Sequence, residues 1–253
     1  RVPFLVRSGV LDMAEEVRIA AAIDVGSNSV HLLLAELGGE VLRDESELLG
    51  LGAMVDIEGF IPEDGLAAMV HVLTRYVNEA TEAGAEWITL AATEPLRRAS
   101  NRTIARAAVL AATGLELHVL SHEDEALLTV LGVLDGVPAT EPTMILDIGG
   151  GSSEVVLLAP GADPVVGVIP VGSARLTAQH VEDDPPTEAE VRELRAEAHH
   201  LFSSLPTGHP QRGIVVGGSG TNLIKLTTDE GDEDAPDSGL IDTDRTARAI
   251  EIV

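Results

Sequence analysis

Short apolar runs separated by polar breaks dominate the first part of this chain and predict β-strands. Three runs near residues 19–25, 30–37 and 40–48 follow one another closely, as in a meander of strands. Two more runs, at about 86–92 and 115–120, predict further strands. The spacing between the third and fourth runs leaves room for helices, so this part of the chain is predicted to be α/β.

Helical periodicity fills the gaps between these strands. Apolar residues recur at helical spacing from Ile61 to Val77, with Pro62 at the first turn, and again over about 102–112. Ser121 is placed to cap another helix. The stretch from Asp135 to Pro142, which contains glycine and proline, then interrupts the pattern and is the predicted domain boundary.

A similar order of elements begins again after this boundary. Strands are predicted near 143–148, 153–159 and 164–169, and another at 213–216. A capping box at Thr187 starts a helix whose apolar side is expected to be buried: Val191, Leu194, Ala198 and Leu201. The later segments are predicted as a third glycine turn at 217–222, an acidic loop at 229–237 and a final helix at 243–252.

A short acidic turn occurs twice, each time between two apolar runs. The first copy is Asp24-Val25-Gly26-Ser27-Asn28-Ser29, and the second is Asp147-Ile148-Gly149-Gly150-Gly151-Ser152, which continues to Glu154. Glycine lets backbone N–H groups approach an anion closely, and the hydroxyl groups add donors. An aspartate beside such a turn can hold a divalent cation that accompanies a phosphate. The repeat predicts two similar halves that face each other across a phosphate-binding cleft.

Composition narrows the classes of partner. The 253 residues carry a net charge of −26, with 42 acidic and 16 basic side chains, so a broad basic face for nucleic acid or an anionic membrane is excluded. The absence of cysteine excludes disulfides, thiolate metal sites and a cysteine nucleophile. No apolar run approaches the length of a membrane span, and the N-terminal residues lack a secretion signal. We therefore predict a soluble cytoplasmic protein, and the missing initiator Met indicates a fragment.

Two further segments carry candidate chemistry. Arg97 and Arg98 lie at a predicted strand-to-helix transition, and guanidinium groups match phosphate oxygens in bidentate fashion. A phosphate contact and an ordinary surface role fit Arg97 equally well, whereas Arg102 and Arg106 fit a solvated helix face. The acidic residues that follow Ser121 suit the positive end of a helix dipole, but crowding among carboxylates also raises their pKa values and favours a general base.

Taken together, these motifs resemble the exopolyphosphatase/guanosine pentaphosphate phosphohydrolase family of the actin–hexokinase–heat-shock chaperone superfamily. The resemblance covers about residues 19–228. Six segments carry it, in the order and at the spacing of the family: AAIDVGSNSVHLLLAEL (21–37), TEPLRRASN (93–101), LSHEDEALLTVLGV (120–133), MILDIGGGSSEVVL (144–157), IPVGSARLT (169–177) and VVGGSGTNLIKL (215–226).

The resemblance implies an α/β fold of two ribonuclease-H-like (actin-like ATPase) domains, with mixed β-sheets flanked by helices and a cleft between them. We expect a leader at 1–18, an N-terminal domain at 19–134 and a C-terminal domain at 135–253. We expect the last to be truncated before the final strand and closing helix of the family.

The resemblance also implies roles for individual residues. Glu125 would be the general base. The phosphate-binding residues would be Ser27, Asn28, Arg97, Gly149, Gly150, Gly151 and Ser152. Mg²⁺, or another divalent cation, would be held by Asp147, Glu154 and Asp24. The family commonly has an arginine where this chain has Leu127, so a phosphate contact is lost there or supplied elsewhere, for example by Arg98 or Arg175.

The implied activity is release of terminal orthophosphate from inorganic polyphosphate. Hydrolysis of the 5′ γ-phosphate of guanosine pentaphosphate stays open as an alternative, because the same catalytic centre serves both substrates. A non-catalytic protein that binds phosphate or nucleotide and signals through a partner is the third alternative. A homodimer is also left open.

Overall fold

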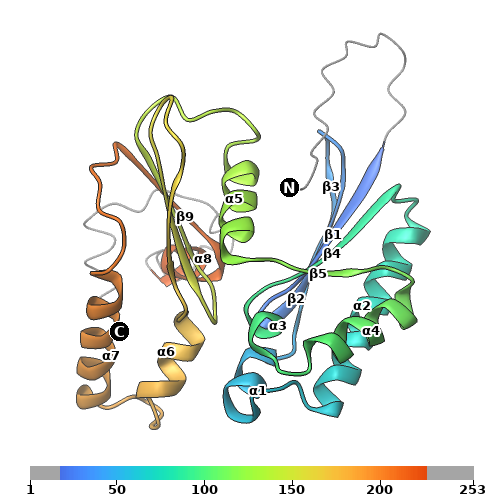
Figure 1. Cartoon of the computed structure of the whole chain (residues 1–253), viewed down its shortest axis with the longest axis horizontal. Helices are drawn as coiled ribbons and strands as arrows, with labels where there is room; N and C mark the ends of the chain where they lie inside the picture. The colour runs from blue at the N-terminus through green and yellow to red at the C-terminus, as the bar shows by residue number, and fades with distance from the viewer. Residues whose placement is uncertain (1–17, 227–253) are drawn as a thin grey trace.

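The computed structural model describes residues 18–226, and these form two β-sheets that stand side by side (Figure 1). The leader up to residue 17, the acidic loop at 229–237 and the helix at 243–252 lie outside the described residues. No helix between residues 18 and 226 is both long and apolar enough to span a bilayer.

The first sheet has five strands in the order β3-β2-β1-β4-β5. The strands are β1 (Ile19–Val25), β2 (Ser29–Glu36), β3 (Val41–Leu48), β4 (Trp87–Ala92) and β5 (Leu117–Val119). The first three form the predicted antiparallel meander, whereas β4 and β5 run parallel to β1. The sheet is therefore mixed, as predicted.

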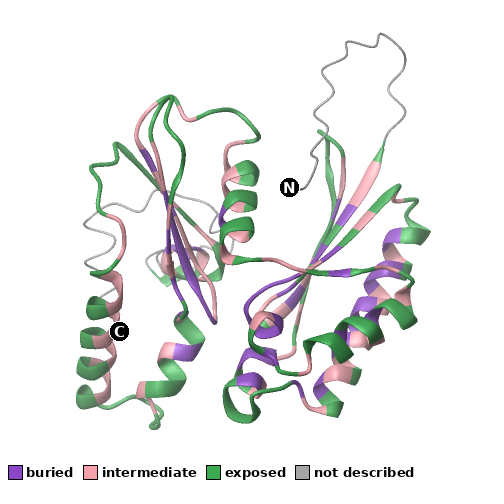
Figure 2. Cartoon of the chain, viewed as in Figure 1, coloured by how far each residue is buried: buried purple, intermediate pink, exposed green. Residues whose placement is uncertain are grey.

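Four helices accompany this sheet: α1 (Leu51–Glu58), α2 (Glu63–Glu82), α3 (Glu94–Arg98) and α4 (Arg102–Thr113). The apolar side of α2 is buried at Met69, Leu73 and Val77, as predicted, and Tyr76 is buried beside them. These side chains join one cluster with the buried residues of β1, β2 and β4. Figure 2 shows the buried positions of this half gathered on the central strands and on the helix faces beside them.

The second sheet has four strands in the order β8-β7-β6-β9. The strands are β6 (Thr143–Ile148), β7 (Ser153–Leu158), β8 (Val165–Ile169) and β9 (Arg212–Val216). Its antiparallel pairs β6–β7 and β7–β8 and its parallel pair β6–β9 repeat the order and directions of β1 to β4. The predicted fold class, two α/β units with mixed sheets flanked by helices, is confirmed.

The helices of the second half are α5 (His122–Val133), α6 (Ser173–His180), α7 (Glu188–Phe202) and α8 (Gly217–Leu226). Although α5 precedes the Gly/Pro-containing stretch, it lies beside the second sheet (Figure 1), where Ala126 packs with Ile145 and Val156. The predicted division at 134/135 stays a prediction, but the core packing of α5 is with the second half.

Two local predictions need correction. The capping box of α7 is present at Thr187 and Glu190, but none of its residues is fully buried, because the helix packs on α6 at the outside of this half. The third glycine segment is the start of α8 rather than a turn. Only Gly217 has a left-handed backbone there, with φ of 78°.

Candidate active site

The two acidic turns have the same internal geometry. In the β1–β2 turn the amide of Gly26 donates to the carbonyl of Ser29 at 2.9 Å, and in the β6–β7 turn Gly149 donates to Ser152 at 3.0 Å. Each turn joins two antiparallel strands, with Asp24 and Asp147 near the end of the first. The predicted repeat of strand, acidic turn and strand is therefore confirmed.

A cleft of about 590 Å³ lies between the two turns. Both turns line it, together with the start of α8 and carboxylates from both halves. Its lining includes Asp24, Ser27, Asn28, Glu94, Glu125, Asp147, Gly149, Gly150, Gly151, Ser152, Gly217, Gly218 and Ser219. Arg97 and Glu154 are not in this lining, but both contact residues at its edge.

Arg97 on α3 reaches across to the first turn of α5. Its Nη1 donates to Glu125 Oε2 at 2.6 Å and to the carbonyl of Leu120 at 3.0 Å, and its Nη2 lies 3.4 Å from Ser152 Oγ. The Arg97 and Glu125 side chains are only 13% and 20% exposed. Burial, and then the charge of Glu154, raise the pKa of Glu125, whereas the Arg97 guanidinium lowers it. Arg97 thus favours the ionised carboxylate that a base requires.

Asp147 and Glu154 lie directly opposite each other on β6 and β7. Side chains at such positions share one face of the sheet, and like charges there repel. Burial and the charge of Asp147 raise the pKa of Glu154 to about 7, although a hydrogen bond from Ser152 acts in the other direction. Burial also raises the pKa of Asp147. The pair is therefore costly to ionise without a nearby cation.

Asp24 faces the same cleft from the first half. Asp24 is exposed to solvent within the cleft, but the protein atoms of the surrounding walls replace part of the water near its carboxyl group. This burial, together with the charges of Glu125 and Asp147, raises the pKa of Asp24 to about 6. Three carboxyl groups from both halves thus influence one another's ionisation across the cleft.

The pKa of Glu154 gives a stability prediction. The folded protein holds this proton more tightly than a carboxyl group of ordinary pKa 4.5, so ionisation destabilises the fold as the pH rises through about 7. We expect Glu154→Gln to raise the melting temperature at about pH 8 in EDTA and to lose this advantage near pH 4.5. Thermal unfolding at both pH values measures the difference. The exposed Glu116→Gln is the control, and a destabilised variant at the higher pH would contradict the prediction.

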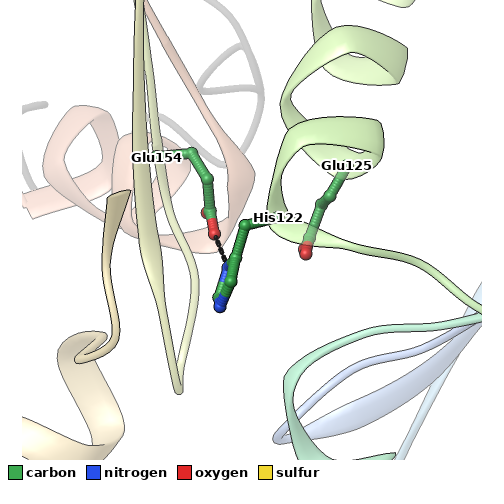
Figure 3. Close-up of side chains that lie close together, drawn as sticks. All are labelled: His122, Glu125 and Glu154. Carbon is green, nitrogen blue, oxygen red and sulfur yellow. Dashed lines mark hydrogen bonds and ion pairs between the residues drawn. The ribbon is translucent and has the colours of Figure 1, made fainter. Parts of the chain in front are cut away.

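His122 joins this group although its sequence context gave it no role. Its Nδ1 lies 2.9 Å from Glu154 Oε1 (Figure 3). The same nitrogen lies 3.1 Å from Arg97 Nη2. The nitrogen can donate to Glu154 or accept from Arg97, depending on the tautomer, but not both. Ligand atoms of His122, Glu125 and Glu154 all lie within 4.8 Å of one another. Imidazole nitrogen and carboxylate oxygen in this arrangement could hold a divalent cation.

Glu94 and Arg175 are two further residues to which the sequence gave no definite role. They form a buried ion pair between α3 and α6, with side chains 4% and 7% exposed. Arg98 pairs with the same Glu94 and with Asp56. Arg98 and Arg175, suggested as replacements for the arginine missing at Leu127, are thus engaged with carboxylates. Leu127 itself is 41% exposed.

The family model of the Ppx/GppA phosphatase family matches residues 35–251. The chain belongs to this family. It is 32% identical over 215 residues to "Exopolyphosphatase 1" of Mycobacterium tuberculosis, covering 81% of this chain and 62% of that protein. It is 31% identical over 225 residues to "Exopolyphosphatase 2" of the same organism, covering 81% of this chain and 70% of that protein. The chain thus spans less than two thirds of the length of the first relative.

Solved structures of the Ppx/GppA family have the same fold. A family member from Aquifex aeolicus superimposes with a TM-score of 0.69 at 28% identity, covering 83% of this chain and 70% of that one. An exopolyphosphatase from Cytophaga hutchinsonii gives a TM-score of 0.74 at 23% identity, covering 83% of this chain and 70% of that chain. The second likeness supports the fold alone.

Proposed function

We propose that this Ppx/GppA family chain hydrolyses inorganic polyphosphate and releases terminal orthophosphate. The observation that carries the proposal is the Arg97–Glu125 pair beside a cleft lined by glycine and serine. A carboxylate that is held by a guanidinium group, next to turns that can bind anions, is suited to hydrolysis of a phosphoanhydride. The two mycobacterial relatives, which are named exopolyphosphatases, support the same reaction.

In this proposal the two turns bind the terminal phosphates. Asn28 offers a side-chain donor from the first half, and the turn from Gly149 to Ser152 offers backbone amides from the second, although the Gly149 amide itself closes the turn. The Ser27 and Ser152 hydroxyls would bind phosphate by exchanging their present partners, Glu94 and Glu154. Arg97 adds charge, and its Nε is a buried donor without an acceptor in the described part of the chain. The start of α8 adds the N-terminus of a ten-residue helix to the same wall.

Glu125 is the proposed general base. It would orient a water molecule and accept its proton while the water oxygen bonds to the terminal phosphorus and the bond to the bridging oxygen breaks. Orthophosphate leaves, and the shortened chain retains the bridging oxygen. Phosphoryl transfer of this kind depends mainly on positioning and on stabilising charge.

The acidic side chains at the second turn fit a divalent cation. Between residues 18 and 226, the contact of Glu154 with His122 is the one ion pair that involves either Asp147 or Glu154, so neither carboxylate is paired there with an Arg or Lys side chain. Asp147, Glu154 and Asp24 would hold Mg²⁺ or another divalent cation. His122 is a further candidate ligand, because it groups with Glu154 and Glu125. When bound, the cation would neutralise charge on phosphate oxygens.

Polyphosphate is favoured over guanosine pentaphosphate because the cleft lining contains no Phe, Tyr or Trp on which guanine could stack. We therefore expect faster orthophosphate release from polyphosphate when both substrates are assayed side by side with Mg²⁺. Faster turnover of guanosine pentaphosphate would assign the site to that substrate. Binding of either compound by isothermal titration without any release would favour a non-catalytic regulatory protein.

The setting of this activity is proposed from sequence. We expect no nucleic-acid or anionic-membrane partner, because the net charge is −26. The cytoplasmic location remains the prediction made from the sequence. A homodimer remains a prediction.

A further inference from the structure

The two halves of the described chain have separate apolar cores. One cluster gathers buried residues between positions 21 and 117, and the other gathers Ala126, Ile145 and Val156 with their neighbours. Neither cluster contains residues of the other, and no apolar cluster within residues 18–226 spans both halves. The relative position of the halves therefore depends on polar contacts and on the connecting chain.

Arg97 makes some of these polar contacts, with Glu125, His122 and Ser152. Arg175 makes the others from the opposite direction. Its Nε donates to both oxygens of Asp56, at 3.0 and 3.1 Å, and its Nη2 donates to Glu94. Its Nη1 donates to the carbonyls of Gly151 and Pro170, each at 2.7 Å. The side chain is 7% exposed. One guanidinium group from the second half thus binds two carboxylates of the first half and the glycine turn of its own half.

Glu94 connects this ion pair to the turn of the first half. Its Oε2 accepts a hydrogen bond from Ser27 Oγ at 3.0 Å, and its Oε1 accepts from Arg98 at 3.0 Å as well as from Arg175. The side chain is only 4% exposed, so the loss of one donor is not readily replaced by water. The carboxylate therefore links Ser27, on one side of the cleft, to Arg175.

The two glycine turns are in direct contact beside this pair. A Cβ atom added at Gly151 would collide with Ser27 Oγ and with the Glu94 carboxylate, and one added at Gly150 would lie 2.8 Å from the Asn28 amide nitrogen. Small displacements of one half would thus change the spacing of the proposed phosphate donors. The same contact separates the cleft from a second cavity of about 570 Å³, which Arg175, Asp56 and Arg98 line.

We propose that Arg175 and Glu94 form a positioning pair that holds the two glycine turns facing each other and so keeps the cleft closed before substrate binds. The expected effect of this pair on phosphate affinity rests on the proposed function. Its expected effect on the distance between the two halves does not. Without Arg175, Asp56 and Glu94 would retain Arg98 as their one basic partner in the described chain, and two carbonyls would lose a donor. Repulsion and unpaired buried groups would favour separation of the halves.

The closure itself can be measured without substrate. The chain has no cysteine, so Ala107→Cys on α4 and Ala196→Cys on α7 give two exposed labelling sites on different halves. Electron–electron double resonance between spin labels should show a longer or broader distance distribution in Arg175→Gln than in the labelled parent. Glu94→Gln is the second variant, and it should change the distribution in the same direction.

Arg75→Gln is the matched control, because Arg75 binds Glu45 and Glu79 entirely within the first half. It should leave the distance distribution unchanged. Circular dichroism should show that each variant keeps its helices and strands. If Arg175→Gln does not fold, Arg175→Lys takes its place. Because lysine keeps the charge but not the forked geometry, its distance distribution should lie only partly away from the parental one. Distributions identical to the parent in both Arg175→Gln and Glu94→Gln would overturn the proposal.

A kinetic measurement separates this inference from the proposed function. If both hold, Arg175→Gln raises the KM for polyphosphate by about tenfold or more, with a smaller change in kcat, because fewer molecules have the turns aligned. If the halves separate in the variant but the parent releases no orthophosphate, the positioning pair stands and the proposed function fails. If the distances in the variant are unchanged and the parent releases orthophosphate, the proposed function stands and the positioning pair fails.

Discussion

Glu125→Gln is expected to lower the rate of orthophosphate release by about 10³-fold, because a general base contributes roughly 10²–10⁴-fold. Glutamine keeps the size of the side chain and can still accept from Arg97 Nη1, but it cannot take a proton from water. Polyphosphate binding should therefore persist. Orthophosphate release measures the first effect, and isothermal titration measures the second.

The control is Glu123→Gln, which changes an exposed carboxylate in the same helical turn. This variant should retain nearly parental activity. Near-parental release by Glu125→Gln would remove Glu125 from the mechanism, whereas loss of binding in that variant would assign the residue to phosphate binding.

Arg97→Gln is expected to lower kcat/KM by about 10²–10³-fold, as does loss of one preorganised donor in other enzymes. The change also affects Glu125, since the guanidinium lowers the pKa of that carboxyl. Without it, the pKa of Glu125 rises, so a higher pH is needed to ionise the base. The acid limb of the kcat profile should therefore shift to higher pH.

Arg102→Gln is the matched control, because Arg102 is exposed and its hydrogen bond is to the carbonyl of Arg97 at 3.3 Å. It should leave both the rate and the acid limb nearly unchanged. A normal pH profile with a reduced rate in Arg97→Gln would mean that Arg97 binds phosphate without influencing the base.

The sequence predicted the repeated framework well, because its signals are local. Apolar runs, glycine turns and the capping residue Ser121 each act within a few residues. The Asp24 and Asp147 turns could therefore be placed at the ends of strands before their spatial relation was known. Arg97 could be singled out as a candidate for the same reason, whereas the role of Glu125 came from the family resemblance.

The features that the sequence did not predict depend on distant contacts. Glu94 and Arg175 are 81 residues apart, and His122 and Glu154 are 32 apart. In the sequence, Glu94 is an acidic residue in the first turn of a helix, a common surface arrangement. Its contact with Arg175 forms only when the two halves meet.

Tertiary packing also overrode two local patterns. The glycines after β9 favour a turn, yet Gly218 and Gly220 continue the helix, and Gly220 is buried against Val215. The apolar side of α7 predicted a buried helix, but this helix lies at the outside of the second half. In both cases the conformation or burial of the segment depends on the elements packed beside it, and the local sequence pattern contains no information about those elements.

The most direct test of the central claim is hydrolysis of polyphosphate with Mg²⁺ in ¹⁸O-labelled water. Attack of water on the terminal phosphorus predicts that each released orthophosphate carries one ¹⁸O atom, and that Glu125→Gln forms this product about 10³-fold more slowly. Tight binding of polyphosphate by the parental protein without formation of labelled orthophosphate would contradict the account.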